Sequence, residues 1–144
     1  MRNRWKIILS LVLVTAVTVS LYSYYLYNKP HDDMAQQAAE FNLTAQTLID
    51  AFATDEVGST AKFSNKIVEV TGVVAAKSQG SGGSVLISLG DVMSGVSCAV
   101  DSADVAPYKE ILDKMAEGDS VTFRGRCDGM LTDVQLSRCV PISK

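Results

Sequence analysis

Three cysteines carry the most reactive side chains in this sequence, and all fall in its second half: Cys98, Cys127 and Cys139. In an oxidising compartment thiols tend to pair, and an odd number leaves one unpaired. The alternatives are a disulfide, three buried thiols that pack as small apolar groups, and a metal site. The metal site is disfavoured, because no C-x-x-C pair occurs and the single histidine, His31, lies far from the cysteines in the chain. We expect no metal and no other cofactor.

Acid–base or nucleophilic catalysis would need side chains that this sequence does not group together. No carboxylate pair stands out, and no Ser/His/Asp set can be assembled around His31. The glycine-rich segment 78–84 lacks the Gly-Lys-Ser/Thr of a phosphate-binding loop, and no helix is expected to begin there. We therefore expect a protein that is not an enzyme, with residues 78–84 as a flexible loop between two strands.

Arginines form the one basic cluster of the predicted strands: Arg124, Arg126 and Arg138. Arg124 and Arg126 share a strand face, because strand side chains alternate between faces. Arg126 is expected opposite Asp133, with Glu69 on a neighbouring strand. We interpret the cluster as a solvated row of ion pairs.

Charge is distributed unevenly along the chain. Residues 1–30 contain four basic side chains and no acidic one, so residues 31–144 hold the other 9 basic side chains against all 16 acidic ones, a net charge of −7. A domain that binds phosphate backbones normally has a basic surface. The segments 85–89 and 96–100 also contain no aromatic side chain on which a base could stack. Nucleic-acid binding is the alternative function, and we do not expect it.

Residues 7–27 are a run of 21 residues without a charged side chain. As a helix they would extend about 31 Å, enough for a hydrocarbon core of about 30 Å. Trp5 precedes the run, and Tyr22, Tyr24, Tyr25 and Tyr27 lie near its other end, as in the aromatic belts of membrane interfaces. The sequence predicts a single-pass transmembrane helix over residues 7–27.

The basic residues of the leader 1–6 predict which side of the membrane each end occupies. Arg2, Arg4 and Lys6 favour a cytoplasmic N-terminus in the inner membrane, with the domain beyond the anchor outside the cytoplasm. A cleaved signal peptide is the rival interpretation, but the bulky tyrosines that follow residue 20 are a poor cleavage context. We therefore favour an uncleaved anchor.

Beyond the anchor the sequence predicts a stalk over residues 28–42 and one folded domain over residues 43–144. The stalk begins where Pro30 breaks the anchor helix and a polar stretch follows. The domain begins with a helix, for which Thr44 is a typical N-cap residue and whose apolar spacing continues to about Thr54. A second short helical turn follows.

From Lys66 onward the apolar period changes from about 3.6 to 2, which indicates strands. The predicted elements are strands 67–76, 85–89 and 96–100, a helix 104–115, and a hairpin of strands 120–127 and 131–139. Gly72 in the first strand indicates a bend of the kind that closes a small barrel. This order is typical of a five-stranded OB-fold Greek-key barrel. The predicted fold class is mainly β, with the leading helix and the transmembrane helix added.

Four segments carry a resemblance to a known family: Lys66–Gly72, Val96–Cys98, Gly118–Gly129 and Asp133–Cys139. They resemble the tRNA-anticodon-binding-like OB-fold family of small bacterial envelope proteins, many of them lipoproteins. The resemblance covers about residues 43–142 and implies the fold. Its motifs are turns and strand ends, which imply neither a chemistry nor tRNA binding. This chain lacks the N-terminal cysteine to which lipoproteins attach their lipid.

The fold limits which cysteines can pair. Cys127 and Cys139 belong to one predicted hairpin that turns near Gly129, which separates them by about 20 Å. A disulfide needs Cα atoms within about 7 Å. The third and fifth strands of an OB-fold are neighbours, so Cys98–Cys139 is the preferred bridge.

Two loops flank the usual ligand face of an OB-fold. In this sequence they hold six candidate contact residues: Gly80, Gly82, Gly83, Asp128, Gly129 and Met130. The sequence favours a membrane-anchored binding or adaptor domain whose partner is an envelope protein, a peptide or a glycan. A thiol-active domain is a further alternative, which would need an exposed cysteine of low pKa.

Overall fold

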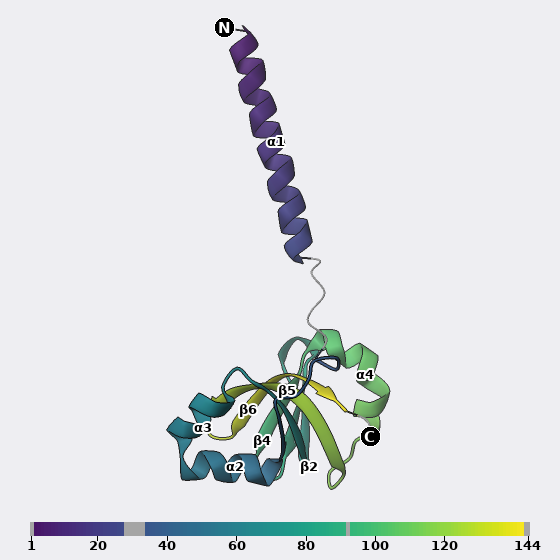
Figure 1. Ribbon diagram of the computed structural model, residues 1–144. Coiled ribbons are helices and arrows are strands. Elements are labelled where there is room, and N and C mark those ends of the chain that lie inside the picture. The colour runs from purple at the N-terminus through teal and green to yellow at the C-terminus, as the bar shows by residue number, and fades with distance from the viewer. Residues whose placement is uncertain (1, 28–33, 92, 143–144) are drawn as a thin grey trace. The chain divides into compact units, whose positions relative to one another are not determined.

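The computed structural model describes residues 2–27, 34–91 and 93–142 (Figure 1). The chain divides into two compact units, Met1–Asp32 and Asp33–Lys144. The side chain of Trp5, and the stalk residues 28–33 with His31, lie outside the described residues.

The first unit contains one long helix, α1 (Arg2–Tyr27). Its 22 residues from Lys6 to Tyr27 have a mean hydropathy of 2.0, and their apolar side chains are exposed. An anchor and a signal sequence share this length and composition. The structure therefore confirms an apolar N-terminal helix that is long enough to cross a membrane.

The second unit is built on six strands: β1 (Phe41–Thr44), β2 (Ile67–Gln79), β3 (Val85–Leu89), β4 (Val96–Val100), β5 (Ser120–Met130) and β6 (Val134–Pro141). β2 to β6 close into a barrel, because β5 pairs with β6 and also with β2. The helix α4 (Ser102–Lys114) connects β4 to β5. The five-stranded OB-fold is confirmed. Helices still contain more of the described residues than strands do, so "mainly β" describes the barrel alone.

Two helices precede the barrel, α2 (Ala45–Thr54) and α3 (Glu56–Phe63), and in Figure 1 they lie on the side of the sheet away from α4. α2 begins where predicted, because the hydroxyl of Thr44 accepts a 3.1 Å hydrogen bond from the backbone N–H of Thr47. Leu48 and Phe52 on its apolar face are 0% and 1% exposed, so this helix closes the core of the barrel.

β1 has no counterpart among the predicted strands. It pairs in parallel with residues 68–71 of β2. The ring of Phe41 packs edge-on against Phe63, with 5.0 Å between centroids, and Met34 is only 6% exposed. Residues from Met34 onward therefore belong to the folded unit, although the sequence predicted a stalk as far as residue 42.

The hairpin between β5 and β6 turns later than predicted. Met130 still pairs with Val134, and residues 131–133 make the turn. Asp128 and Gly129 lie inside β5 at a register shift, where Gly129 has a φ of 116°. The pair Asp-Gly favours a turn by its local propensity, but here it forms a bulge that lets the strand continue.

Gly72 is required by packing and does not occupy a left-handed backbone conformation. It lies opposite Val121 of β5. A Cβ at this position would lie 2.9 Å from Cβ of Ala45 and 3.1 Å from Cβ of Leu89. The glycine thus admits α2 close to β2, and the strand bends just beyond it, at a register shift between residues 74 and 76.

Candidate binding groove

Three neighbouring hollows on the surface of the folded unit share the side chain of Thr71. Their volumes are about 610, 560 and 570 Å³. We call them together the Thr71 groove. Thr71 lies on β2, with Thr44 of β1 beside it on one edge and Thr122 of β5 on the other. The register of three strands therefore places a row of three hydroxyl side chains across the groove.

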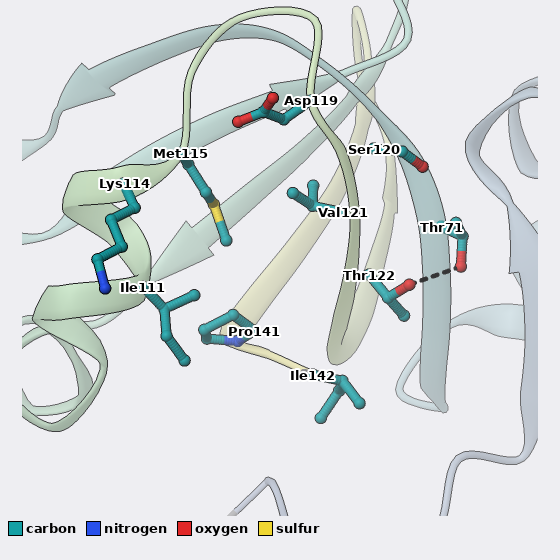
Figure 2. A pocket seen from close by; sticks show the side chains of 10 residues that line it. All are labelled: Thr71, Ile111, Lys114, Met115, Asp119, Ser120, Val121, Thr122, Pro141 and Ile142. Carbon is teal, nitrogen blue, oxygen red and sulfur yellow. Dashed lines mark hydrogen bonds between the residues drawn. The ribbon is translucent and has the colours of Figure 1, made fainter. Parts of the chain in front are cut away.

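The first hollow lies between the C-terminal end of α4, the start of β5 and the end of β6 (Figure 2). Half of its lining residues are apolar, namely Ile111, Met115, Val121, Pro141 and Ile142, and Lys114 and Asp119 add charged groups. On the opposite side Figure 2 shows Thr71 and Thr122, whose hydroxyl oxygens lie 2.9 Å apart in a hydrogen bond. The hollow thus combines an apolar wall with a hydroxyl pair.

The second hollow lies between the start of α2 and the connection from β3 to β4. Val73 lines it and is 49% exposed, which is unusual for a valine in the middle of a barrel strand. Gln46 and Asp91 add polar groups to the rim. Exposed apolar surface beside polar groups is typical of surfaces that contact other molecules.

The third hollow lies over the outward faces of β1 and β2, where Asn42, Thr47 and Glu69 line it together with Thr44 and Thr71. The carboxylate of Glu69 is engaged by an arginine. Hydroxyl and amide groups therefore supply the available hydrogen-bonding groups of this hollow.

The arginine cluster is not the solvated row of ion pairs that the sequence predicted. Arg124 is the buried member: its Nη1 donates 2.8 Å hydrogen bonds to the carbonyl oxygens of Ala35 and Gln37, and its Nη2 donates to Glu69. The Arg124 and Glu69 side chains are only 17% and 15% exposed. The guanidinium of Arg124 therefore binds the segment before β1 to the barrel, and these contacts leave it unavailable to a ligand.

Arg126 also differs from the prediction. Its Nε lies 3.6 Å from Oδ1 of Asp128 on the same strand, whereas Asp133 was predicted as its partner. The later turn of the hairpin explains the difference, since it places Ser137 opposite Arg126. Arg138 occupies β6 with a φ of 52°.

The six predicted loop residues do not line the Thr71 groove. Gly80, Gly82 and Gly83 are exposed in the connection that contains the short 3₁₀ helix Ser81–Gly83, and Gly83 borders a separate hollow of about 230 Å³ against α4. Asp128, Gly129 and Met130 are residues of β5, and Met130 packs against the core. The ligand-binding surface that the sequence predicted, flanked by these two loops, is therefore a different surface from the Thr71 groove.

The outward faces of β3 and β4 would be the stacking platform of a nucleic-acid-binding OB-fold. The residues that alternate there with the fully buried ones are Leu86, Ser88, Ser97 and Ala99. They are small or aliphatic, and Ser97 is only 3% exposed. This face offers neither an aromatic ring to a base nor a cation to a phosphate.

All three cysteines are free, and each is 0% exposed. Burial raises the pKa of the Cys127 thiol, and burial together with the neighbouring Cys98 raises the pKa of Cys139 well above its ordinary value. None of the three thiols has the exposure of a reactive cysteine. Among the described residues, no three His, Cys, Asp or Glu side chains are grouped closely enough to hold a metal ion.

The folded unit is thus a five-stranded barrel with a leading helix and a helix between its third and fourth strands, and an apolar helix precedes it in the chain. A family model, tRNA_anti-like, matches residues 1–140. The chain belongs to the tRNA_anti-like family. The resemblance noted in the sequence is thereby confirmed, over more of the chain than the 43–142 first assigned to it. No curated protein sequence matches the chain.

The chain is similar to several solved structures. A "putative nucleic acid-binding lipoprotein" from Klebsiella pneumoniae subsp. pneumoniae is 16% identical, with a TM-score of 0.57 over 80% of this chain and all of that one. A chain of the S. pombe Stn1–Ten1 complex is 15% identical (TM-score 0.42), with 54% of this chain and 59% of that chain covered. An OBody bound to hen egg-white lysozyme is 16% identical (TM-score 0.43), with 58% and 85% covered.

Sequence reasoning missed the groove because its residues come from six separate helices and strands and from the connections between them. Thr44 was recognised only as a helix cap, and Thr71 only as a strand residue. One local signal existed: Phe41, Asn42, Leu43 and Thr44 alternate between apolar and polar side chains, which is the pattern of a short strand.

Proposed function

We propose that this protein is a non-enzymatic binding domain of the cell envelope that holds a segment of a partner protein in the Thr71 groove. Residues 7–27 anchor it in the inner membrane with residues 1–6 in the cytoplasm, and the barrel lies outside the cytoplasm. The observation that carries the proposal is the lining of the groove, where exposed apolar side chains lie beside hydroxyl and amide groups and a few charged ones at Glu69, Asp91, Lys114 and Asp119.

Such a lining suits a polypeptide segment. Its apolar side chains can pack beside Ile111 in the first hollow and beside Val73 in the second, which are 38% and 49% exposed. Its backbone can exchange hydrogen bonds with the side-chain amide of Asn42 and with the Thr71 hydroxyl, which keeps bonding capacity beyond its bond to Thr122. Protein interfaces commonly combine an apolar centre with a rim of hydrogen-bonding groups in this way.

Nucleic-acid binding is the second candidate, and the name of the Klebsiella protein of the same fold is the observation that favours it. Three features of this chain oppose it: the net charge of −7 over residues 31–144, the buried position of Arg124, and the lack of aromatic side chains on the outward faces of β3 and β4.

A photo-crosslinking residue in place of Val73 tests the proposal in living cells. We expect a protein adduct, because Val73 lies in the groove. A crosslinker at Val57 is the matched control, since that valine is 82% exposed on α3, outside the groove. The adduct from position 73 should disappear when Ile111→Asp places a charge in the apolar hollow.

Three outcomes would count against the proposal. Equal adducts from positions 73 and 57 would indicate non-specific contact, and an adduct that survives Ile111→Asp would place the partner elsewhere. An adduct with nucleic acid in place of protein would favour the second candidate.

A further inference from the structure

Cys98 and Cys139 are two wholly buried thiols that the proposed binding function does not use. They lie on β4 and β6, which run side by side in parallel, with Cys98 directly opposite Leu136. The Sγ of Cys139 donates a 3.5 Å hydrogen bond to the carbonyl oxygen of the same Leu136. Both cysteines therefore lie against the backbone of Leu136, at one point of the β4–β6 ladder.

An irregular backbone brings Cys139 to this position. Leu136 and Cys139 are three residues apart and would occupy opposite faces of a regular strand, yet they are only 1% and 0% exposed. Between them Arg138 adopts a φ of 52°, a left-handed conformation that a residue other than glycine occupies at a cost. This irregularity turns Cys139 back into the barrel.

A glycine on the next strand leaves room for the sulfur atom. A Cβ on Gly125 of β5 would lie only 2.6 Å from Sγ of Cys139, inside van der Waals contact. The left-handed backbone of Arg138 and the missing side chain at Gly125 are two separate features. Both position the sulfur atom of Cys139.

We propose that Cys98 and Cys139 are an oxidation site, at which an intramolecular disulfide joins β4 to β6 while Cys127 remains a thiol. Cys98 and Cys127 both lie opposite Leu136, on the two strands that flank β6. Two strand spacings, about 9.6 Å, therefore separate them, more than the roughly 7 Å between Cα atoms that a disulfide spans.

The reaction is thiol–disulfide exchange with a disulfide-bonded oxidant, either a protein or a small molecule. One cysteine thiolate attacks a sulfur of the oxidant, which forms a mixed disulfide and releases one thiolate of the oxidant. The second cysteine thiolate then attacks its partner's sulfur and releases the other thiolate. The chain loses two electrons and two protons, and the oxidant is reduced to two thiols.

Burial determines when this exchange can occur. Neither sulfur is accessible once the barrel has closed. The bond therefore forms during folding, and afterwards it resists reduction until the barrel opens. The oxidising compartment that supplies the oxidant rests on the proposed function, in which the barrel lies outside the cytoplasm.

The test uses the full chain in detergent. Reduced and unfolded protein is refolded with oxidised glutathione, unfolded again in an alkylating reagent, and mapped by peptide mass spectrometry. We expect one alkylated cysteine per chain, Cys127, and a linked pair of peptides that contain Cys98 and Cys139. Cys127→Ala should keep the bond with no alkylation, whereas Cys98→Ala should leave two alkylated cysteines.

Three alkylated cysteines, or a bond to Cys127, would overturn the proposal. Because a variant could fail for lack of folding, a second measurement compares thermal unfolding with and without reductant. Reduction should lower the unfolding temperature of the native chain and of Cys127→Ala by several degrees and leave that of Cys98→Ala unchanged; equal shifts in all three would also overturn the proposal.

The same peptide mapping, applied to protein that is alkylated inside cells, tests the Cys98–Cys139 bond and the location of the barrel outside the cytoplasm separately. A Cys98–Cys139 bond in cells supports both. A bond that forms with glutathione but not in cells supports the pairing and contradicts an extracytoplasmic barrel.

Discussion

Arg124 and Glu69 form a 2.9 Å ion pair between β5 and β2, from which water is largely excluded. The same guanidinium donates to two backbone carbonyls of the segment before β1. One side chain thus joins the barrel to the chain that arrives from α1. Removing the Arg124 side chain would leave the nearly buried carboxylate of Glu69 without its ion-pair partner. The carbonyl oxygens of Ala35 and Gln37 would lose their hydrogen-bond donor.

Arg124→Ala should therefore lower the free energy of unfolding by about 2–4 kcal/mol, somewhat less than a fully buried pair would lose. Lys66→Ala is the matched control, because the Lys66–Glu40 pair also joins this segment to the chain just before β2 but has side chains that are 45% and 47% exposed. That variant should lose less than about 1 kcal/mol. Urea denaturation measures both, and equal losses would mean that Arg124 acts as an ordinary surface charge.

Gly72→Val should lower the free energy of unfolding by at least about 2 kcal/mol, because the added side chain meets Ala45 and Leu89 at 2.9 and 3.1 Å. Gly72→Ala should cost less. If the cost is steric, Ala45→Gly should restore part of the loss in Gly72→Ala. Thermal unfolding of the four variants checks this, and a double variant that melts no higher than Gly72→Ala would point to the backbone of β2 instead.

The chain should show no salt-sensitive binding to single-stranded oligonucleotides at physiological ionic strength, because residues 31–144 carry a net charge of −7 and Arg124 is engaged. Fluorescence anisotropy over a salt series provides the measurement. Micromolar binding that weakens steeply with salt, and that Arg126→Ala and Arg138→Ala reduce, would favour a nucleic-acid function.

A reporter that is active only outside the cytoplasm should be active when fused after Lys144, because three basic residues precede the apolar run. A reporter that is active only in the cytoplasm, fused at the same place, is the control and should be silent. The reverse result would invert the topology. The fusion should also keep its full length in membranes, since a shortened product would identify residues 7–27 as a cleaved signal sequence.

Patterns of neighbouring residues determined much of this structure. The apolar run before Tyr27, the Thr44 cap of α2 and the period-2 strands from Ile67 each depend on residues close together in the chain, and each is present in the structure. Local propensity and periodicity act within a few residues, so a single sequence reveals them.

Contacts between residues that are distant in the chain decided where β5 ends and whether β1 forms. The Asp128-Gly129 pair would favour a turn on its own, but Cys127 and Met130 on either side pack in or against the core and keep β5 extended through it. β1 is a strand only because residues 68–71 offer it an edge. The free energy of these choices comes from burial and from hydrogen bonds across strands, and both depend on which segments the closed barrel brings together.

The candidate site depends entirely on such contacts. Thr44, Thr71 and Thr122 are separated by dozens of residues in the chain, and only the registers of β1 and β5 on β2 place them in one row. Arg124 looked like a surface charge in the sequence, and it is engaged because Glu69 and the carbonyls of residues 35 and 37 converge on it. Composition and spacing determined the family, the barrel and the apolar helix; strand register, which no local pattern encodes, decided the groove.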